Sequence, residues 1–149
     1  MISFELNIQI YRPAKQVFDF VARPENDFQW QYGTLASAQV SKSEIGLGTL
    51  IHTIGYFMGR RIEFMNEVTD FEPTKRYGFD SLTGPVDTHT LYVFETHESG
   101  TKINLAIKTN TRDLFKPNDA GIEKKFKKQY KENLAMLKNV LETHPIAVP

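Results

Sequence analysis

The sequence predicts an α+β fold in which a curved, seven-stranded antiparallel sheet wraps around one long C-terminal helix, with two short helices after the first strand. Three observations support this prediction. Apolar and polar residues alternate with a period of two in several segments, turn signals recur between Leu35 and Thr109, and one long amphipathic segment follows them. A curved sheet laid against a single helix does not close everywhere, so we expect a hollow that can bind a ligand.

The N-terminal part is predicted to contain one strand and both short helices. Apolar residues occupy every second position from Phe4 to Ile10, which indicates a strand with one buried face. Pro13 suits the first position of a helix, because no hydrogen bond is lost there. Pro24 ends this helix and starts a second short one over Glu25–Trp30.

Six further strands and the long helix complete the predicted fold. Turns that contain Gly or Pro separate β-branched and aromatic runs, as in a meander of hairpins. The predicted strands are Leu35–Ser41, Thr49–Phe57, Arg61–Phe71, Arg76–Leu82, Asp87–Thr96 and Thr101–Thr109. Apolar residues at spacings of three and four predict a helix over Asn118–Glu142, with lysines on its solvated side. We expect one domain over residues 1–149, with a frayed tail over Thr143–Pro149.

The composition argues against several classes of protein. Lys plus Arg and Asp plus Glu both number 18, so no net field attracts nucleic acid, and we expect no nucleic-acid partner. The chain has no cysteine, which removes disulfides and thiolate metal sites and fits a reducing compartment. No signal-peptide pattern is visible, and no apolar run approaches the roughly 18 residues of a membrane span. We therefore expect a cytoplasmic protein without integral membrane association.

Several local motifs occur in an order that is hard to obtain by accident. They are Arg12-Pro-Ala-Lys-Gln-Val-Phe18, Pro24-Glu-Asn-Asp-Phe-Gln-Trp30, Gly46-Leu-Gly-Thr49, Met58-Gly-Arg-Arg61, Val68-Thr-Asp-Phe-Glu-Pro73 and Gly100-Thr-Lys102. Over nearly the whole chain, these motifs and the element order resemble the START-like helix-grip (SRPBCC) superfamily, in particular its polyketide cyclase/dehydrase-like branch. The resemblance implies a cavity between the sheet and the last helix. Members bind lipids, sterols, hormones or polyketides, and some catalyse cyclisation, but no catalytic residue is shared.

Alternation predicts which side chains face the hollow. Tyr77 and Phe79 share the inner face of the fifth strand, and the apolar residues of 103–109 do so in the seventh. The sixth strand is ambiguous, because the face with Tyr92 and Phe94 competes with the face that carries His89 and Leu91. We prefer the first face, since aromatic side chains bury the larger area.

Two strands leave alternatives open. The fourth strand places Asn66 in an apolar row with Phe64. An unpaired buried amide costs roughly 1–3 kcal/mol, so Asn66 is a candidate ligand contact, although we favour a hydrogen bond to a bulge or to a buried water. In the third strand, the set that contains His52 and the set that contains Ile51 compete for the inner face.

The predicted site is aromatic. Its ligand contacts are Phe64, Asn66, Tyr77, Phe79, Tyr92, Phe94, Phe126 and Tyr130. Trp30 and Tyr32 are predicted at the pocket entrance, where the short helices return to the sheet. For any single ring we favour a core role, whereas for the group we favour a cavity, which suits a flat, largely apolar ligand with one or two polar groups.

Catalytic and metal-binding motifs are weak. The four histidines are scattered without metal-ligand spacing, so we expect no metal and no other cofactor. Only His52 and His89 fall on strands that could reach the pocket, and for both we favour a solvent-facing position over a general base. Gly46–Thr49 lacks the third glycine of a dinucleotide loop and precedes a strand. No catalytic residue is assigned, and enzymatic activity stays open.

The sequence therefore predicts a protein that encloses a small hydrophobic or aromatic molecule between the sheet and the C-terminal helix, as a carrier, sensor or sequestering module. The first alternative is a cyclase or dehydratase that uses the same cavity, which requires an inward-facing titratable group. The second is a protein-interaction module without a ligand, which requires the sheet and the helix to pack solidly. The oligomeric state is left open.

Overall fold

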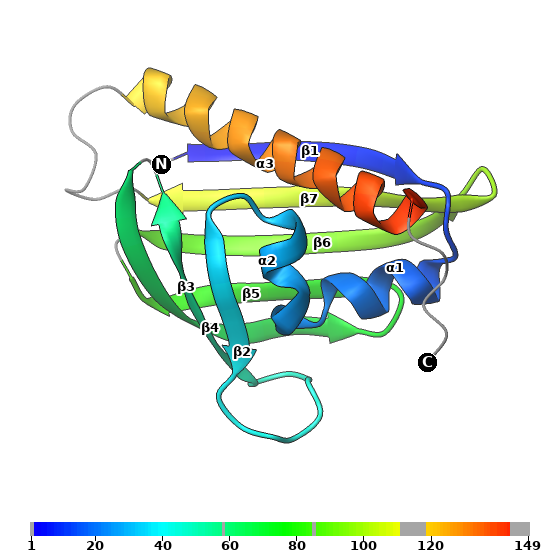
Figure 1. The fold of residues 1–149 in the computed structure, drawn as a ribbon, viewed down its shortest axis with the longest axis horizontal. Coiled ribbons are helices and arrows are strands. Elements are labelled where there is room, and N and C mark those ends of the chain that lie inside the picture. The colour runs from blue at the N-terminus through cyan, green and yellow to red at the C-terminus, as the bar shows by residue number, and fades with distance from the viewer. Residues whose placement is uncertain (1, 58, 85, 111–118, 144–149) are drawn as a thin grey trace.

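A computed structural model of the chain shows one antiparallel sheet that curves around a long helix (Figure 1). The structure describes residues 2–57, 59–84, 86–110 and 119–143. The elements are β1 (Ile2–Ile10), α1 (Ala14–Val21), η1 (Pro24–Asn26), α2 (Asp27–Trp30), β2 (Thr34–Gln39), β3 (Leu50–Phe57), β4 (Arg60–Glu72), β5 (Arg76–Thr83), β6 (Asp87–His97), β7 (Gly100–Asn110) and α3 (Asp119–Thr143). The strand order is β1-β7-β6-β5-β4-β3-β2, and the short helices lie on the same face as α3.

The predicted fold class and element order are confirmed, and the observed strand boundaries lie within two residues of the predicted ones. One element differs. The segment predicted as a helix over Glu25–Trp30 is a 3-10 turn followed by a single α-helical turn, because Gln31 is already extended and the segment is too short for a regular helix. Asn118 and the tail residues 144–149 lie outside the described residues.

The alternation of side chains decides which residues point at α3. Ile103 and its apolar neighbours in β7 are buried, as is Tyr92 in β6, so both predicted inner faces are confirmed. The open question in β3 is also settled. Ile51 is buried on the inner face, whereas His52 pairs with Glu63 at 2.6 Å on the solvent side.

The β6–β7 hairpin is closed by two residues in the left-handed region. Glu98 has φ 45° and Ser99 has φ 63°. Positive φ at both central residues is the requirement of a type I′ turn, whose twist matches that of the flanking strands. The turn sets the register that pairs Tyr92 with Leu105, and thereby places both side chains on the inner face.

The half of the interface toward the C-terminus of α3 is packed solid. Leu134, Leu137 and Leu141 of α3 are buried, and Leu137 has no exposed surface. Phe18 of α1 packs edge-on against Phe94 of β6, with ring centroids 5.2 Å apart. Apolar burial of this kind is the main favourable contribution to folding, so this half supplies much of the stability of the protein.

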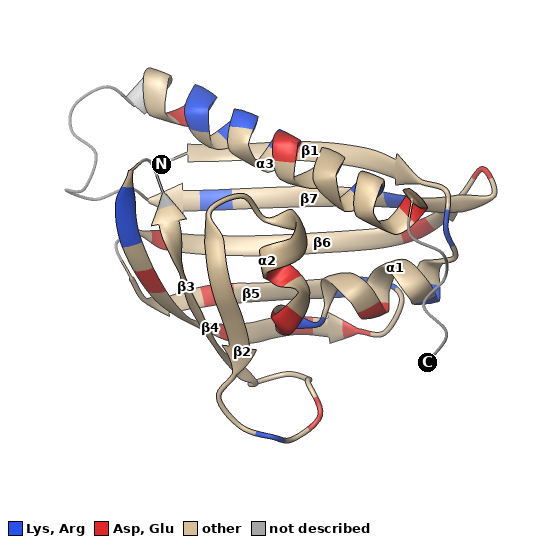
Figure 2. Cartoon of the chain, in the orientation of Figure 1, with Lys and Arg blue, Asp and Glu red and all other residues tan. Residues whose placement is uncertain are grey.

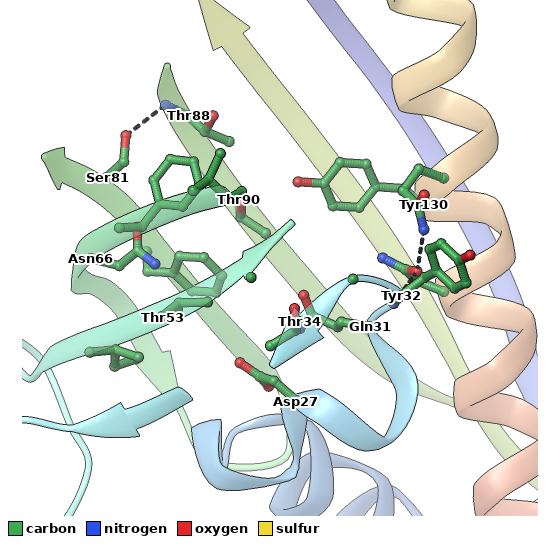
Figure 3. A pocket seen from close by; sticks show the side chains of 18 of the residues that line it. Asp27, Gln31, Tyr32, Thr34, Thr53, Asn66, Ser81, Thr88, Thr90 and Tyr130 are labelled. Atoms are coloured by element: carbon green, nitrogen blue, oxygen red, sulfur yellow. Dashed lines mark hydrogen bonds between the residues drawn. The ribbon is translucent and has the colours of Figure 1, made fainter. Parts of the chain in front are cut away.

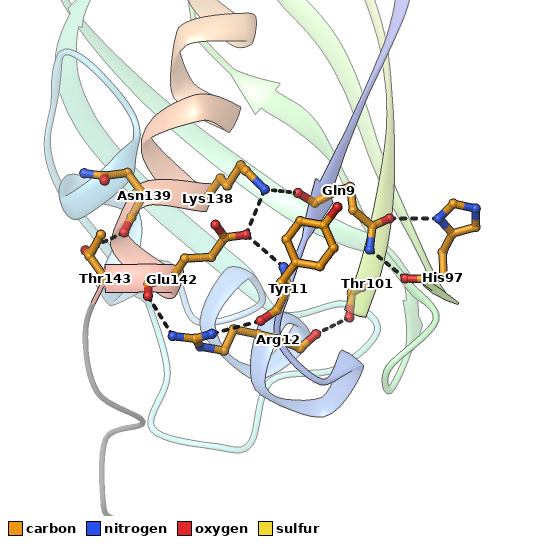
Figure 4. Close-up of polar contacts among 9 residues, drawn as sticks. All are labelled: Gln9, Tyr11, Arg12, His97, Thr101, Lys138, Asn139, Glu142 and Thr143. Atoms are coloured by element: carbon orange, nitrogen blue, oxygen red, sulfur yellow. Dashed lines mark hydrogen bonds and ion pairs between the residues drawn. The ribbon is translucent and has the colours of Figure 1, made fainter. Parts of the chain in front are cut away.

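Polar contacts also fix this end of α3 (Figure 4). The Glu142 carboxylate accepts hydrogen bonds from the Tyr11 amide and the Lys138 ammonium, both at 2.8 Å. Lys138 donates a second bond to the Gln9 carbonyl at 2.6 Å and lies 4.6 Å from the centre of the Tyr11 ring. Arg12 donates to the Glu142 backbone carbonyl at 2.7 Å. We call Gln9, Tyr11, Arg12, Lys138 and Glu142 the closed end.

Glu142 is charged at neutral pH. Burial alone would raise the pKa of its carboxyl, but hydrogen bonds from Lys138 and the Tyr11 amide, together with the charges of Lys138 and Arg12, lower that pKa below its ordinary value. The carboxylate therefore ties the last turn of α3 to the connection between β1 and α1.

Acidic and basic positions are dispersed over helices, strands and loops rather than gathered on one face (Figure 2). The lysines of α3 are interrupted by acidic residues, and Lys128 lies 4.0 Å from Glu132 one turn later. Within the described part of the chain, no helix combines the length and the apolar character needed to cross a membrane.

Candidate functional site

A cavity of about 140 Å³ lies between the sheet and the first half of α3 (Figure 3). Residues of β3, β4, β5 and β6 line its sheet side, α3 covers it, and the segment from α2 to β2 closes one flank. A cavity of roughly 150 Å³ accepts one benzene-sized molecule, so this one has room for a ring-sized ligand. The hollow that the sequence predicts is present.

Aromatic rings from two neighbouring strands form the apolar wall. Tyr77 of β5 and its register partner Tyr92 of β6 are stacked, with centroids 6.3 Å apart and planes 15° from parallel. The Phe79 ring follows at 5.5 Å from Tyr77. Phe126 and Tyr130 close the opposite side from α3, and Figure 3 shows the Tyr130 hydroxyl pointing from the helix toward the sheet. These rings offer flat apolar surface on both sides of the cavity.

The structure brings seven of the eight predicted contacts together around the cavity. They are Phe64, Asn66, Tyr77, Phe79, Tyr92, Phe126 and Tyr130. Phe94 is not among the described lining residues, which corrects its predicted placement. It points to the correct face of β6, but α1 covers that stretch, so its ring packs against Phe18 in the solid core. Contact between the seven residues and a ligand stays a prediction.

The two residues predicted at the entrance have different environments. Tyr32 is 78% exposed and contributes to the cavity lining, so it lies at the rim. Trp30 is only 2% exposed and packs edge-on against Tyr92, with centroids 6.2 Å apart. Trp30 therefore lies behind the wall and not at the rim, because the single turn of α2 directs it into the core. Its indole N–H is buried without a hydrogen-bond partner in the described structure.

Two contacts hold the rim together. The Asn133 side-chain oxygen accepts hydrogen bonds from the Tyr32 amide and from the Gln129 side chain, both at 2.9 Å. This ties α3 to the loop after α2. On the other flank, the Tyr56 amide donates to the Gly33 carbonyl at 2.7 Å. Gly33 has φ 87°, and a Cβ atom there would strike the Tyr56 carbonyl, so the close approach requires glycine.

Asn66 presents an unpaired amide to the cavity. The bulge that the sequence analysis considered is present, between Met65 and Asn66 of β4. Even so, no described residue forms a hydrogen bond with the Asn66 side chain, and Figure 3 shows this side chain in the cavity wall. The Ser81 hydroxyl, by contrast, already donates to the Val86 carbonyl and accepts from the Thr88 amide. Asn66 is therefore a polar group free to meet a ligand.

Asp27 also lines the cavity, although no sequence motif indicated it. The residue opens α2, and Figure 3 shows its carboxyl directed into the hollow. Burial raises the pKa of this carboxyl to about 8; the Ser37 hydroxyl lowers it by less, and the charge of Glu25 raises it further. Asp27 is thus mostly protonated at neutral pH and is a hydrogen-bond donor.

The hydroxyls of Tyr77, Tyr92 and Tyr130 are neutral as well. Burial raises the pKa of Tyr130 to about 12. Burial is also the largest cause of the raised pKa of Tyr77 and Tyr92, to which the nearby charge of Asp27 adds. The site therefore consists of apolar rings and uncharged polar groups, which can bind and orient an uncharged molecule.

The strand histidines lie outside the site. His52 pairs with Glu63, and His89 forms a short contact with Asp80; both histidines are more than a third exposed. The solvent-facing positions favoured from the sequence are thus observed. Across the described ranges, no group of three or more His, Cys, Asp or Glu side chains is placed to hold a metal ion.

Comparisons with known proteins agree with this architecture. A START superfamily protein from Mycobacterium smegmatis superposes with a TM-score of 0.83 at 10% identity, over 95% of this chain and 98% of that one. The Zhui aromatase/cyclase from Streptomyces sp. R1128 superposes with a TM-score of 0.76 at 16% sequence identity. The match covers 94% of this chain and 93% of that one. A protein of Thermus thermophilus superposes with a TM-score of 0.77 at 16% sequence identity. The match covers 95% of this chain and 99% of that one. At these identities the likeness shows the fold alone.

Sequence comparison identifies the family. No curated protein matches the chain. The family model described as polyketide cyclase / dehydrase and lipid transport matches residues 1–142, nearly the whole sequence. The resemblance to the polyketide cyclase/dehydrase-like branch is thereby confirmed, and the chain belongs to the polyketide cyclase / dehydrase and lipid transport family.

Proposed function

We propose that this protein binds one small, flat, largely apolar molecule in the cavity beneath α3, as a carrier, sensor or sequestering module. The observation that carries the proposal is an aromatic cavity in which the Asn66 amide has no hydrogen-bond partner among the described residues. Asn66 is half-buried, so a ligand atom that pairs with its amide gains a fixed orientation and about 0.5–1.5 kcal/mol, as for one net hydrogen bond.

The free energies of burial and association favour a largely apolar ligand that also carries a polar group. Burial of about 150 Å² of apolar ligand surface contributes on the order of 4 kcal/mol at about 25 cal/mol per Å². Association costs in translational and rotational freedom are of similar size or larger. Apolar burial alone therefore gives weak binding, and hydrogen bonds to Asn66 or the tyrosine hydroxyls supply the remainder.

Native mass spectrometry of protein purified without denaturation tests the proposal directly. We expect a stoichiometric bound molecule, or, for stripped protein, a rise in melting temperature with part of a panel of aromatic and hydrophobic compounds. A clean apo mass combined with no thermal shift across the panel would contradict ligand binding.

Substitutions in the wall locate the binding site. Tyr77→Ala is expected to weaken the affinity for a compound identified in the panel at least tenfold, because Tyr77 supplies much of the flat surface. Phe79→Ala is the milder companion variant, since Phe79 is only partly buried. Phe28→Ala is the control, because Phe28 is 58% exposed and lies outside the cavity lining. Unchanged affinity in both wall variants would remove this wall from the site.

Cyclisation or dehydration of a polyketide-like chain is a second candidate function, favoured by one observation. Asp27 is a titratable group that faces the cavity, as the enzyme alternative requires. If the protein is such an enzyme, a linear poly-β-ketone will be converted to an aromatic product detectable by ultraviolet absorbance, and Asp27→Asn will lower turnover per bound substrate. An interaction module without a ligand receives less support, because it requires solid packing where the cavity lies.

A further inference from the structure

We infer that Asp27 sets the ligand specificity of the cavity by donating a hydrogen bond from its protonated carboxyl to a carbonyl oxygen of an uncharged aromatic ligand. This inference rests on the proposed function and adds the class of ligand: an aromatic ketone, aldehyde or quinone.

The position of Asp27 supports this role. Asp27 lies at the start of α2, on the flank of the cavity, and its carboxyl points toward the space between the strands and α3 (Figure 3). Among the described lining residues it is the one carboxylic acid, and none is Lys, Arg or His. Among the ion pairs of the described residues none involves Asp27, so no positive charge compensates a carboxylate there.

The groups around Asp27 favour its neutral form. Glu25 of η1 adds negative charge nearby. Tyr77 of β5 and Tyr92 of β6 face it with uncharged hydroxyls, as does Tyr130 of α3 within the same cavity. The Ser37 hydroxyl of β2 stabilises the charged form. Its effect on the pKa is larger than that of Glu25 but smaller than that of burial, so the pKa is raised. A carboxyl buried without a counter-ion keeps its proton, as its pKa of about 8 reflects.

A protonated carboxyl selects among ligand classes. It offers a donor to a carbonyl oxygen, which has no hydrogen of its own to give. It offers no compensation to an anionic ligand, since basic side chains are absent from the described lining. Asp27 would have to lose its proton before it could form an ion pair with a cationic ligand, and the cost of this deprotonation lowers the affinity for such a ligand. The Asn66 amide, at the β4 wall, can hold a second polar group of the same molecule.

Three one-ring probes of similar size separate these classes: acetophenone, ethylbenzene and benzylamine. We expect acetophenone to bind about threefold to tenfold more tightly than ethylbenzene at pH 6, as befits one net hydrogen bond. At pH 9.5 Asp27 has lost its proton, so this preference disappears. Benzylamine binds more weakly than acetophenone at pH 6. Isothermal titration calorimetry at both pH values measures all three affinities.

Two variants assign the preference to Asp27. Asp27→Leu removes the donor, so the ratio of acetophenone to ethylbenzene affinity falls to about one at pH 6, as for loss of a single hydrogen bond. Asp27→Asn keeps an N–H donor that does not titrate, so the ratio stays above one and no longer changes between pH 6 and pH 9.5. Carboxyl-carbon NMR of the wild-type protein follows the titration of Asp27 without any ligand.

The outcomes separate this inference from the proposed function. If ethylbenzene binds but acetophenone has no advantage, or if the advantage survives in Asp27→Leu, the inference is wrong while ligand binding stands. If benzylamine binds best and releases a proton from Asp27, the cavity selects cations and the inference is also wrong. If no probe binds even at its solubility limit and no panel compound shifts the melting temperature, both proposals fall together.

Discussion

The two halves of the interface between α3 and the sheet are built for different tasks. Toward its C-terminus, α3 buries leucines such as Leu137 against the sheet and α1, and the closed end fixes its last turn with charged hydrogen bonds. Toward its N-terminus, Phe126 and Tyr130 line a cavity, and the polar groups there include Asn66, whose side chain has no hydrogen-bond partner in the described structure.

This difference shows that one helix serves two purposes: its C-terminal half stabilises the fold, and its N-terminal half covers the cavity. Solid packing and paired charges stabilise the protein where no ligand has to enter. Unfilled space and an acid whose pKa is raised both cost stability, and they lie in the half that can recover the cost from a ligand.

The largest effect is expected from truncation in the solid half. Leu137→Ala removes a fully buried side chain from α3 and is expected to lower the free energy of unfolding by roughly 3–5 kcal/mol. Phe79→Ala removes a larger side chain, yet it is expected to cost only about 1–2 kcal/mol, because the ring already borders empty space. Urea unfolding of both variants checks this. Equal losses would mean that the cavity wall is as tightly packed as the core.

The next effect concerns Asp27 and pH. Its folded pKa of about 8 lies above the ordinary value of 3.8, so the unfolded chain is ionised between these values while the folded protein holds the proton. Wild-type stability therefore falls as pH rises through this window and levels off above the folded pKa. Asp27→Asn does not titrate, so we expect it to be more stable than wild type by roughly 2–4 kcal/mol at pH 8 and nearly equal at pH 4.

Denaturant unfolding at both pH values measures this difference. A variant that loses stability at pH 8 would show that the Asp27 carboxylate is paired in the folded protein, and would remove the contrast between the two halves.

A smaller effect is expected at the closed end. Glu142→Gln weakens the bonds to Lys138 and the Tyr11 amide and is expected to cost roughly 1–2 kcal/mol at pH 7. The folded pKa of Glu142 is lowered, so its contribution is present above the ordinary value of 4.5 and is lost as pH falls through the lowered pKa. Thermal unfolding as a function of pH follows this loss.

Asp19→Asn is the matched control for Glu142→Gln. The Lys15–Asp19 pair has side chains 80% and 56% exposed, and such surface pairs contribute about 0–1 kcal/mol. If the two substitutions have the same effect, the closed end is no more than an ordinary surface ion pair.

Alternation in the sequence was sufficient to predict much of the fold and the face of most strands. It works for β7 because one face is buried along its whole length, so Ile103 and its neighbours repeat cleanly. It could not decide β3, where both faces mix apolar and polar residues. There the inner face depends on tertiary contacts such as the hydrogen bond between Ser37 and Thr53, 3.0 Å long, across two strands.

The site was harder to predict than the fold, for identifiable reasons. Alternation assigns Phe94 to a face of β6 but cannot say that α1 covers that part of the strand. Asp27 has the sequence context of an ordinary helix-start residue. One signal was present: Pro24, Asp27 and Trp30 recur at a spacing of three, which places the acid on the same inward side as a buried proline and a buried tryptophan.

The rim contact at Asn133 has a consequence for kinetics. In the described structure, its single side-chain oxygen links α3 to the loop after α2, while the far end of the helix is anchored by several charged bonds. The first turns of α3 otherwise pack through apolar contacts such as that between Phe4 and Tyr130, so we expect them to open more readily than the anchored end. We therefore expect the residence time of a guest molecule to depend on how often the hydrogen bond from the Tyr32 amide to Asn133 opens.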